Sequence, residues 1–296
     1  MSNNNNSNFI SIPEAISKFD SCIFIDGSWH LSKDRDARTE YENGPRIKDA
    51  HFFDIDDIAT IDDVNNPKNL PHMMPPTELF AKVMDIFSIT PTSTIVVYGT
   101  RGCAATSRAF YTFKRLCQPS NQIYLMQGSL QEWIDAGGPI ENGLKKSIHA
   151  SDLKLDKAEY EAGTDNNSIT MDQMLLEVSD DVTDSIIIDA RGAGRFYGKE
   201  PEPRPGLRGG HMPGAYNVPF TDLLDNNDVT KFKSPEQMKE VFQNAGVDVA
   251  TEKRVILSCG SGVTACVLAV GLFECGRDPS NTFIYDGSWI DWVSEL

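Results

Sequence analysis

Residues 255–266 read VILSCGSGVTAC, and an apolar run, VLAVGLF, follows at 267–273. This order predicts a strand, a tight loop and a helix, with Cys259 where the strand ends. Gly260 and Gly262 let the loop curl without clashes from a Cβ atom. In such a loop, we expect the backbone N–H groups of residues 260–265 to point at the sulfur, and the first turn of the helix to add partial positive charge. Both effects favour the thiolate, the nucleophilic form, so we interpret Cys259 as reactive rather than structural.

The run CGSGVTAC at 259–266 resembles the active-site loop of the sulfurtransferases of the rhodanese superfamily, the 3-mercaptopyruvate branch in particular. The thiosulfate branch typically carries an Arg-Lys pair after the cysteine, whereas this chain carries the uncharged Gly260 and Ser261. The resemblance extends over nearly the whole chain. It implies that Cys259 is the nucleophile, that Ser261 assists it, and that the substrate sulfur is held at the loop positions Gly260, Gly262, Val263 and Thr264.

The length and composition describe a chain with room for two domains. Its 296 residues are 40% hydrophobic and 24% charged, a balance typical of globular proteins. The net charge is −16 and the sequence pI is about 4.7, so the surface would repel nucleic-acid phosphates and anionic membranes. No apolar run approaches the roughly 20 residues of a membrane span. We therefore expect no direct nucleic-acid partner and no membrane.

The cysteines and the amino terminus indicate the compartment. The six cysteines are spread through the chain without a C-x-x-C pair, which favours free thiols over a disulfide framework or a zinc site. Residues 1–8 are almost all Ser and Asn and lack the marks of a secretion signal or a mitochondrial presequence. We expect a disordered tail at 1–8 and a cytoplasmic protein, with mitochondria as the alternative location.

An internal repeat divides the chain into two halves. Three pairs of landmarks match in order: the aspartates that end apolar runs (Asp26 and Asp189), the first residues of loops (Gly99 and Cys259), and the first glycines of two G-S-x-x-x-W motifs (Gly128 and Gly287). Their offsets are 163, 160 and 159 positions. A nearly constant offset over three landmarks indicates a duplicated domain.

Each half is predicted to form an α/β fold, a mostly parallel sheet flanked by helices on both faces, because strands and helices alternate along the chain. The predicted strands are 21–25, 51–55, 94–98 and 122–127 in the first half, and 185–188, 215–220, 254–258 and 282–286 in the second. Helix signals open runs at 79–87 and 237–245. The resemblance implies two tandem rhodanese-like domains, at 9–140 and 168–296, with a linker at 141–167 and a cleft between the domains.

Only the second half carries a nucleophile at the end of its central strand. Gly99 occupies the position that matches Cys259. We expect Cys103 in or at the start of the following helix, and we interpret Cys103, Cys117 and Cys266 as packing thiols, with a resolving role for Cys266 as the alternative. The domain at 9–140 is therefore predicted to be catalytically inactive, and the domain at 168–296 to be catalytic.

Two arginines in the stretch RFYGKEPEPR at 195–204 are candidates for binding a carboxylate. A guanidinium group is a planar fork that holds a carboxylate through two hydrogen bonds. The stretch resembles the substrate segment of the mercaptopyruvate family, whose two substrate arginines correspond to Arg195 and Arg204; solvated surface arginines are the alternative. We expect Arg191 to fix the loop by pairing with a carboxylate such as Asp189, and His211 to make a structural hydrogen bond.

The family has a proposed helper group of Ser, His and Asp near the cysteine, and this chain departs from it at the histidine. Ser261 matches the serine, and Asp36 is the candidate for the aspartate. Arg46 stands where the first domain of the family carries the histidine. Because arginine stays protonated at neutral pH, it cannot act as a base, and we interpret Arg46 as a further cation that faces the substrate.

The resemblance implies sulfur transfer without a metal or an organic cofactor. Arg195 and Arg204 would hold 3-mercaptopyruvate by its carboxylate, Cys259 would take the sulfur as a persulfide, and pyruvate would leave. The expected acceptors are thiols such as thioredoxin or glutathione, a partner protein, or cyanide, and thiosulfate is expected to be the poorer donor.

The alternative function is a sulfur-relay protein that passes persulfide sulfur to a partner in the thiolation of transfer-RNA wobble uridines. A cysteine phosphatase is excluded, because Ala265 stands where that class carries its phosphate-binding arginine. A kinase-type phosphate loop is excluded as well, because Val263-Thr264 follow Gly262 without the Gly-Lys-Ser/Thr sequence.

Overall fold

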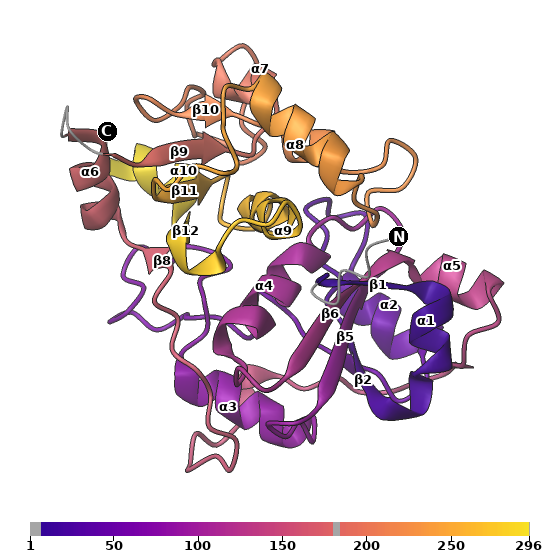
Figure 1. Cartoon of the computed structure of the whole chain (residues 1–296). Helices are drawn as coiled ribbons and strands as arrows, with labels where there is room; N and C mark the ends of the chain where they lie inside the picture. The colour runs from indigo at the N-terminus through magenta and orange to yellow at the C-terminus, as the bar shows by residue number, and fades with distance from the viewer. Residues whose placement is uncertain (1–6, 180–183, 296) are drawn as a thin grey trace. The chain divides into compact units, whose positions relative to one another are not determined.

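The structure, a computed structural model, describes residues 7–179 and 184–295. Its contacts divide the chain into two units, traced in Figure 1, and each unit includes a short segment from the opposite half of the sequence. Unit 1 comprises Met1–Ala59, Pro75–Asp165 and Asn227–Lys231, and unit 2 comprises Thr60–Met74, Asn166–Asn226 and Phe232–Leu296. Residues 1–6 of the predicted tail lie outside the described residues.

Unit 1 is built on a five-stranded parallel sheet in the order β1-β6-β5-β2-β4. Its strands are β1 (Phe9–Ser11), β2 (Cys22–Asp26), β4 (His51–Phe52), β5 (Thr94–Gly99) and β6 (Gln122–Ser129). The central strand β5 is apolar and is buried at every position after its first, as expected of a parallel strand covered on both faces. Because successive side chains alternate, Val96 and Tyr98 face one helical layer, and Ile95 and Val97 face the other.

Helices cover both faces of this sheet (Figure 1). Val96 and Tyr98 share a core cluster with α1 (Ile12–Ser17) and α5 (Leu130–Asp135). The helix α4 (Thr106–Leu116) lies on the opposite face, because a Cβ atom built on Gly27 would lie 2.6 Å from Ala109 Cβ and 3.2 Å from Val97 Cγ1. The other elements of unit 1 are α2 (Ala37–Asn43), α3 (Thr77–Ile86), the antiparallel strands β3 (Arg46–Ile47) and β7 (Ile140–Glu141), and the 3-10 turns η1 (Phe19–Ser21) and η2 (Ala150–Asp152).

Unit 2 has a second five-stranded parallel sheet, in the order β10-β9-β11-β12-β8. Its strands are β8 (Ser168–Ile169), β9 (Ile186–Asp189), β10 (Tyr216–Asn217), β11 (Val255–Ser258) and β12 (Thr282–Tyr285). Its helices are α6 (Met171–Ser179), α7 (Ala193–Phe196), α8 (Pro235–Asn244), α9 (Ala265–Glu274) and α10 (Ser288–Trp292), with the 3-10 turns η3 (Phe220–Leu223), η4 (Pro279–Asn281) and η5 (Val293–Glu295). Ile256 packs with residues of α6 and α10, and α8 and α9 cover the opposite face (Figure 1).

The two sheets repeat one topology. Read from the edge that carries the first strand of each unit, the order β1-β6-β5-β2-β4 corresponds to β8-β12-β11-β9-β10. The matched strands β2 and β9 end in Asp26 and Asp189, and β5 and β11 end at Gly99 and Ser258, directly before Cys259. The prediction of two tandem α/β domains with mostly parallel sheets is therefore confirmed.

The sequence located the central strands better than the edges. Each predicted central strand is found within about two residues of its position, whereas the strands expected at 51–55 and 215–220 are only the two-residue β4 and β10. The edge strands β1 and β8 were not predicted. Ser234 caps α8 through a capping box with Gln237, as the Ser-Pro signal indicated. None of the described helices has the length and apolar character to cross a membrane.

Candidate active site

Hydrogen bonds from the first turn of α10 fix the loop that follows β11. The amides of Trp289 and Ile290 donate to the carbonyls of Cys259 and Gly260 at 3.0 and 3.1 Å. The Ser288 hydroxyl accepts from the amides of Cys259 and Gly262 at 3.1 and 3.0 Å, and it donates to the Tyr285 carbonyl at 2.8 Å. Both ends of the loop are thereby fixed to one serine.

The remaining loop amides are available to a ligand of Cys259. In the described part of the chain, the N–H groups of Gly260, Ser261, Val263 and Thr264 donate no hydrogen bond to a protein acceptor. Unpaired N–H groups in a tight loop before a helix form a concave anion site. Since α9 begins at Ala265, its positive end adds to that field. A persulfide or thiolate on Cys259 is the anion that this loop can stabilise.

Cys259 itself is buried, with only 2% of its surface exposed. The Ser261 side chain is buried as well, and no hydrogen bond of its hydroxyl is found among the described residues. An enclosed site of this kind keeps bulk water away from the sulfur.

Burial keeps three of the other cysteines, Cys103, Cys117 and Cys275, in the protonated thiol form, which is a poor nucleophile. Burial raises the pKa of Cys117 to about 12 and that of Cys275 to about 11, and it also raises the pKa of Cys103. These side chains therefore stay protonated at neutral pH. Cys266 lies in α9 and donates to the Gly262 carbonyl at 3.3 Å, so it packs beneath the loop.

A buried ion-pair network lies beside the loop. Arg191 is almost completely buried and donates to both carboxylate oxygens of Asp189, to Glu202 and to the Gly210 carbonyl. Its guanidinium carbon also lies 4.2 Å from the ring centroid of Trp289. Burial raises the pKa of Asp189, although Arg191 opposes that shift. The expected pairing of Arg191 with Asp189 is confirmed.

Arg195 extends this network to the Cys259 loop. Its Nε and Nη2 atoms donate to Glu202 Oε2, whereas Arg191 occupies Oε1 of the same carboxylate. A Cβ atom built on Gly260 would lie 3.0 Å from Arg195 Nη2, so the guanidinium lies directly against the residue after Cys259. The Arg195 side chain is 23% exposed. One partly exposed cation is therefore held beside the cysteine by a buried carboxylate.

Arg204 lies farther along the same loop and contacts a histidine. Its Nη2 atom is 3.1 Å from His72 Nε2, and both residues belong to unit 2. Among the described residues, no hydrogen bond or ion pair joins Arg204 to Cys259 or to Arg195. His211, as expected, makes a structural contact: its Nδ1 atom is 3.0 Å from the Phe196 carbonyl.

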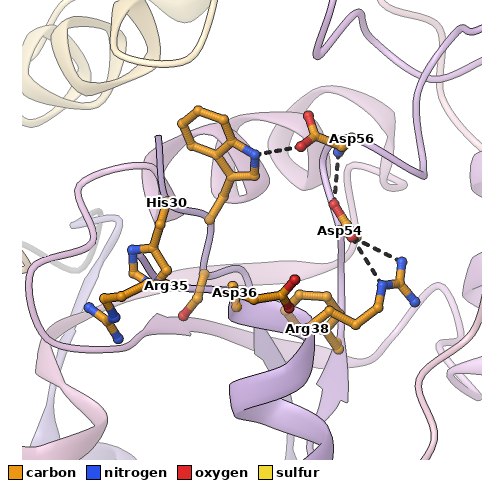
Figure 2. A pocket seen from close by; sticks show the side chains of 10 residues that line it. His30, Arg35, Asp36, Arg38, Asp54 and Asp56 are labelled. Carbon is orange, nitrogen blue, oxygen red and sulfur yellow. Dashed lines mark hydrogen bonds and ion pairs between the residues drawn. The ribbon is translucent and has the colours of Figure 1, made fainter. Parts of the chain in front are cut away.

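Asp36 caps a helix in unit 1. Its carboxylate accepts a 2.6 Å hydrogen bond from the Thr39 amide, which lowers the pKa of Asp36. It lines a pocket of about 180 Å³ with His30, Arg35 and Arg38 (Figure 2). The cations of this pocket have carboxylate partners, Arg35 with Glu40 and Arg38 with Asp54 and Asp57. The assignment of Asp36 to the family's helper group stays a prediction.

Arg46 is an internal cation, not the substrate-facing one expected from the sequence. It is 2% exposed, and it donates to Glu141 and to the carbonyls of Tyr41 and Gly143. These contacts join β3 to α2, to β7 and to Gly143, which follows β7. The correction has a physical reason: the position is enclosed, and a buried guanidinium needs carboxylate and carbonyl acceptors. We do not include Arg46 in the proposed site.

The matching loop of unit 1 has no room for a nucleophile. A Cβ atom built on Gly99 would lie 2.1 Å from Thr106 Oγ1. Cys103 lies in the loop three residues before α4, not in the helix, and its sulfur exchanges hydrogen bonds with the backbone of Trp29. The chemistry therefore differs between two loops of the same topology.

Three residues of the site were not anticipated: Ser288, Glu202 and His72. Ser288 lies in the repeated G-S-x-x-x-W motif, so the repeat was a usable signal. Glu202 lies in the quoted arginine stretch, but its role depends on two arginines that meet only in the fold. No local signal marks His72. The described residues contain no cluster of His, Cys, Asp and Glu that could hold a metal ion.

Known proteins resemble this chain over most of its length. Residues 170–295 match a family described as "Rhodanese-like domain". The chain is 36% identical over 271 residues to the 3-mercaptopyruvate sulfurtransferase of Mus musculus, covering 90% of this chain and 84% of that protein. The Tum1 protein from Saccharomyces cerevisiae superposes with a TM-score of 0.80 at 25% identity, covering 98% and 95% of the two chains. SseA from Escherichia coli is described with the rhodanese fold and the catalytic mechanism of 3-mercaptopyruvate sulfotransferases. It superposes with a TM-score of 0.75 at 28% identity, covering 96% of this chain and 99% of that chain.

Proposed function

Because the chain belongs to the 3-mercaptopyruvate sulfurtransferase family, we propose that it moves the sulfur of 3-mercaptopyruvate through a persulfide on Cys259 to an acceptor thiol. The observation that carries this proposal is the setting of Cys259. Among the described residues, its loop has amides without a protein acceptor, and Arg195 lies against Gly260; in the matching loop of unit 1, Gly99 stands in place of the cysteine.

The first half-reaction forms the persulfide. The Cys259 thiolate attacks the thiol sulfur of 3-mercaptopyruvate, a sulfur–sulfur bond forms, and the carbon–sulfur bond breaks. The electron pair of the broken bond stays on the departing carbon as pyruvate enolate, which takes a proton to give pyruvate. The loop amides stabilise the negative sulfur without reorganising, because Ser288 and α10 already hold the loop.

Arg195 and Arg204 bind the carboxylate and the neighbouring keto oxygen of the substrate. The substrate is an anion, and the guanidinium forks offer it paired hydrogen bonds. Glu202 occupies only one edge of Arg195, its Nε and Nη2 atoms. The enolate oxygen that develops as sulfur leaves is more negative than the ketone, so cations at this position favour the transition state.

The second half-reaction returns the cysteine to its thiolate. An acceptor thiolate, from thioredoxin or glutathione, attacks the outer sulfur, and the bond to Cys259 breaks with its electron pair on Cys259. Cyanide can take the same sulfur. Thiosulfate should be the poorer donor, because Gly260 and Ser261 offer no charged side chain to a sulfonate.

A protein acceptor in a sulfur relay, including one for transfer-RNA thiolation, would use the same persulfide. The net charge of −16 favours a basic protein over RNA as a direct partner. Capture of persulfide-loaded protein by a basic partner, compared with its discharge by glutathione, separates the two acceptor classes.

Pyruvate release with 3-mercaptopyruvate and a thiol acceptor tests the proposal. The Cys259→Ser variant should lose turnover, whereas the control Cys103→Ser, which keeps an acceptor and a donor for the Trp29 backbone, should retain it. Equal turnover by wild type and Cys259→Ser would overturn the assignment. A higher kcat/KM with thiosulfate would overturn only the choice of donor.

A further inference from the structure

A cavity of about 430 Å³ lies within unit 2, apart from the residues proposed for sulfur transfer. Its wall is built by the 60–74 loop, by the segment of β8 and α6, and by residues 286–291. Among the described residues, the wall does not include Cys259, Arg195 or Arg204. The volume is in the range of pockets that bind small organic molecules.

Part of the wall is apolar and adaptable. The side chains of Met73, Ile169, Met171 and Leu175 line the cavity. Methionine is unbranched and polarisable, so it packs against ligands of different shapes. Such a wall can hold an aliphatic or aromatic group.

The charged part of the wall favours a cation. Asp172, Asp286 and Asp291 line the cavity, and Lys68 is the one cation among the described residues of the wall. Asp286 and Asp291 are each 4% exposed, and they accept from the Met74 amide at 2.7 Å and from Lys68 at 2.8 Å. Three carboxylates against one ammonium group leave an excess of negative charge. Attraction of a cation is stronger beside a buried carboxylate than in bulk water.

A buried hydroxyl of the wall supplies a further acceptor. The Oγ atom of Ser168, at the start of β8, is buried and makes no hydrogen bond to the described residues. Buried polar atoms of a folded protein usually have a partner. An N–H group of a bound molecule could donate to this oxygen.

The cavity shares residues 286–291 with the support of the nucleophile loop. Gly287 and Asp291 line the cavity, and a Cβ atom built on Gly287 would collide with the Asp291 carboxylate. Ser288, between these two residues, accepts from the Cys259 amide at 3.1 Å. One short turn therefore contacts both the cavity and the Cys259 loop.

We propose that this cavity binds a small organic ammonium ion with an aliphatic or aromatic body, and that its occupancy is coupled to Cys259 through residues 286–291. The apolar wall takes the body, and the carboxylates of Asp172 and Asp286 take the ammonium group. A positive charge added beside this turn favours the thiolate of Cys259 by Coulombic attraction. The site goes beyond the proposed function, and its binding can be measured without sulfur transfer.

Probes of similar shape and different charge test the chemistry of the cavity. The probes are 2-phenylethylammonium and 3-phenylpropanoate, followed by carbon-13 NMR of the methionine methyl groups. We expect the Met73 and Met171 signals, assigned with Met→Leu variants, to shift until saturation, with a Kd at least about tenfold lower for the ammonium probe. Signals that do not move with the ammonium probe, or equal Kd values for the two probes, would overturn the proposal.

Two neighbouring leucines of α6 give a matched pair of variants. Leu175 lines the cavity and is 42% exposed, whereas Leu176 is 67% exposed and does not belong to the wall. Leu175→Arg places a resident cation at the cavity, so we expect it to raise the Kd of 2-phenylethylammonium at least about tenfold. Leu176→Arg should leave the Kd within about twofold of wild type. Equal Kd values in the two variants would refute binding in this cavity.

Alkylation of Cys259 by the uncharged reagent iodoacetamide measures the coupling without turnover. At constant ionic strength, saturating 2-phenylethylammonium should raise the rate at least about twofold in wild type and Leu176→Arg, but not in Leu175→Arg. The neutral 2-phenylethanol is the control and should leave the rate unchanged. A wild-type rate that does not respond to the ammonium probe would contradict the coupling. A rate that responds in a protein that releases no pyruvate from 3-mercaptopyruvate would sink only the proposed function.

Discussion

At the scale of the residue, charge placement distinguishes the second half of the repeat from the first. Arg191 and Arg195 share the two oxygens of Glu202, which orients both cations with one buried carboxylate. Arg191 is enclosed and structural, whereas Arg195 keeps partial exposure against Gly260. A buried arginine needs a partner on each edge, and a substrate-binding arginine must keep an edge available.

Alkylating reagents test the carboxylate-binding role of Arg204. Iodoacetate and iodoacetamide react with a thiolate in the same way, but only iodoacetate carries a carboxylate. We expect Arg204→Met to lower the ratio of the two Cys259 alkylation rates about tenfold, because it removes a charge-assisted hydrogen-bond pair. Peptide mass spectrometry measures the ratio. The control is Arg208→Met, because Arg208 is exposed and only its carbonyl is used, by Trp289. An unchanged ratio in Arg204→Met would refute the role.

Asp26 gives a pH-dependent prediction in unit 1. Burial raises its pKa from 3.8 to about 6, against the opposing hydrogen bonds from Ser28. Between these values the folded state keeps a proton that the unfolded chain releases, so this residue's contribution to stability falls as pH rises. The stability of wild type relative to Asp26→Asn should therefore decrease by on the order of 2 kcal/mol from pH 4 to pH 7. Urea unfolding at both pH values measures it, and a difference that does not change with pH would contradict the burial argument.

At the scale of the element, one helix start decides the geometry of the nucleophile loop. The first residue of α10, Ser288, has a positive φ of 53°, which few non-glycine residues adopt without a compensating contact. Its hydroxyl joins the amides of Cys259 and Gly262 to the end of β12. In unit 1, the matching Ser129 caps α5 instead.

Replacing the two matched serines separates this role from helix capping. Ser288→Ala leaves two loop amides without an acceptor, so we expect about 2 kcal/mol of lost stability and at least about a tenfold loss of kcat. Ser129→Ala removes a capping box and should cost about 1 kcal/mol with kcat unchanged. Denaturant unfolding and pyruvate release measure both effects. Equal activity losses in the two variants would show that Ser288 acts only through general stability.

At the scale of the whole molecule, the features that could be predicted are those that the sequence pattern itself encodes. The central strands, the repeat and the glycine loop after Cys259 are local patterns, and the structure contains them. The β4 and β10 edges are shorter than predicted, because two-residue pairing leaves little periodicity to read. The burial of Arg46 and the contact of His72 with Arg204 depend on residues far apart in sequence, Glu141 and Arg204.

The assignment of 60–74 to unit 2 and of 227–231 to unit 1 could not be predicted from the sequence either. The division at Asp165 and Asn166 lies within the predicted linker at 141–167, but nothing in 60–74 or 227–231 marks a segment that belongs with the other half. Polar loops of this kind have no periodicity, and their position is set by single contacts such as that between Lys68 and Asp291.

Mass spectrometry of the intact protein and its peptides after exposure to 3-mercaptopyruvate, without an acceptor, tests the central claim most directly. We predict one added sulfur atom, located on the peptide that contains Cys259, and its removal together with sulfide release when a reducing thiol is added. Pyruvate release with an unmodified Cys259, or the added sulfur on another of the six cysteines, would contradict the account.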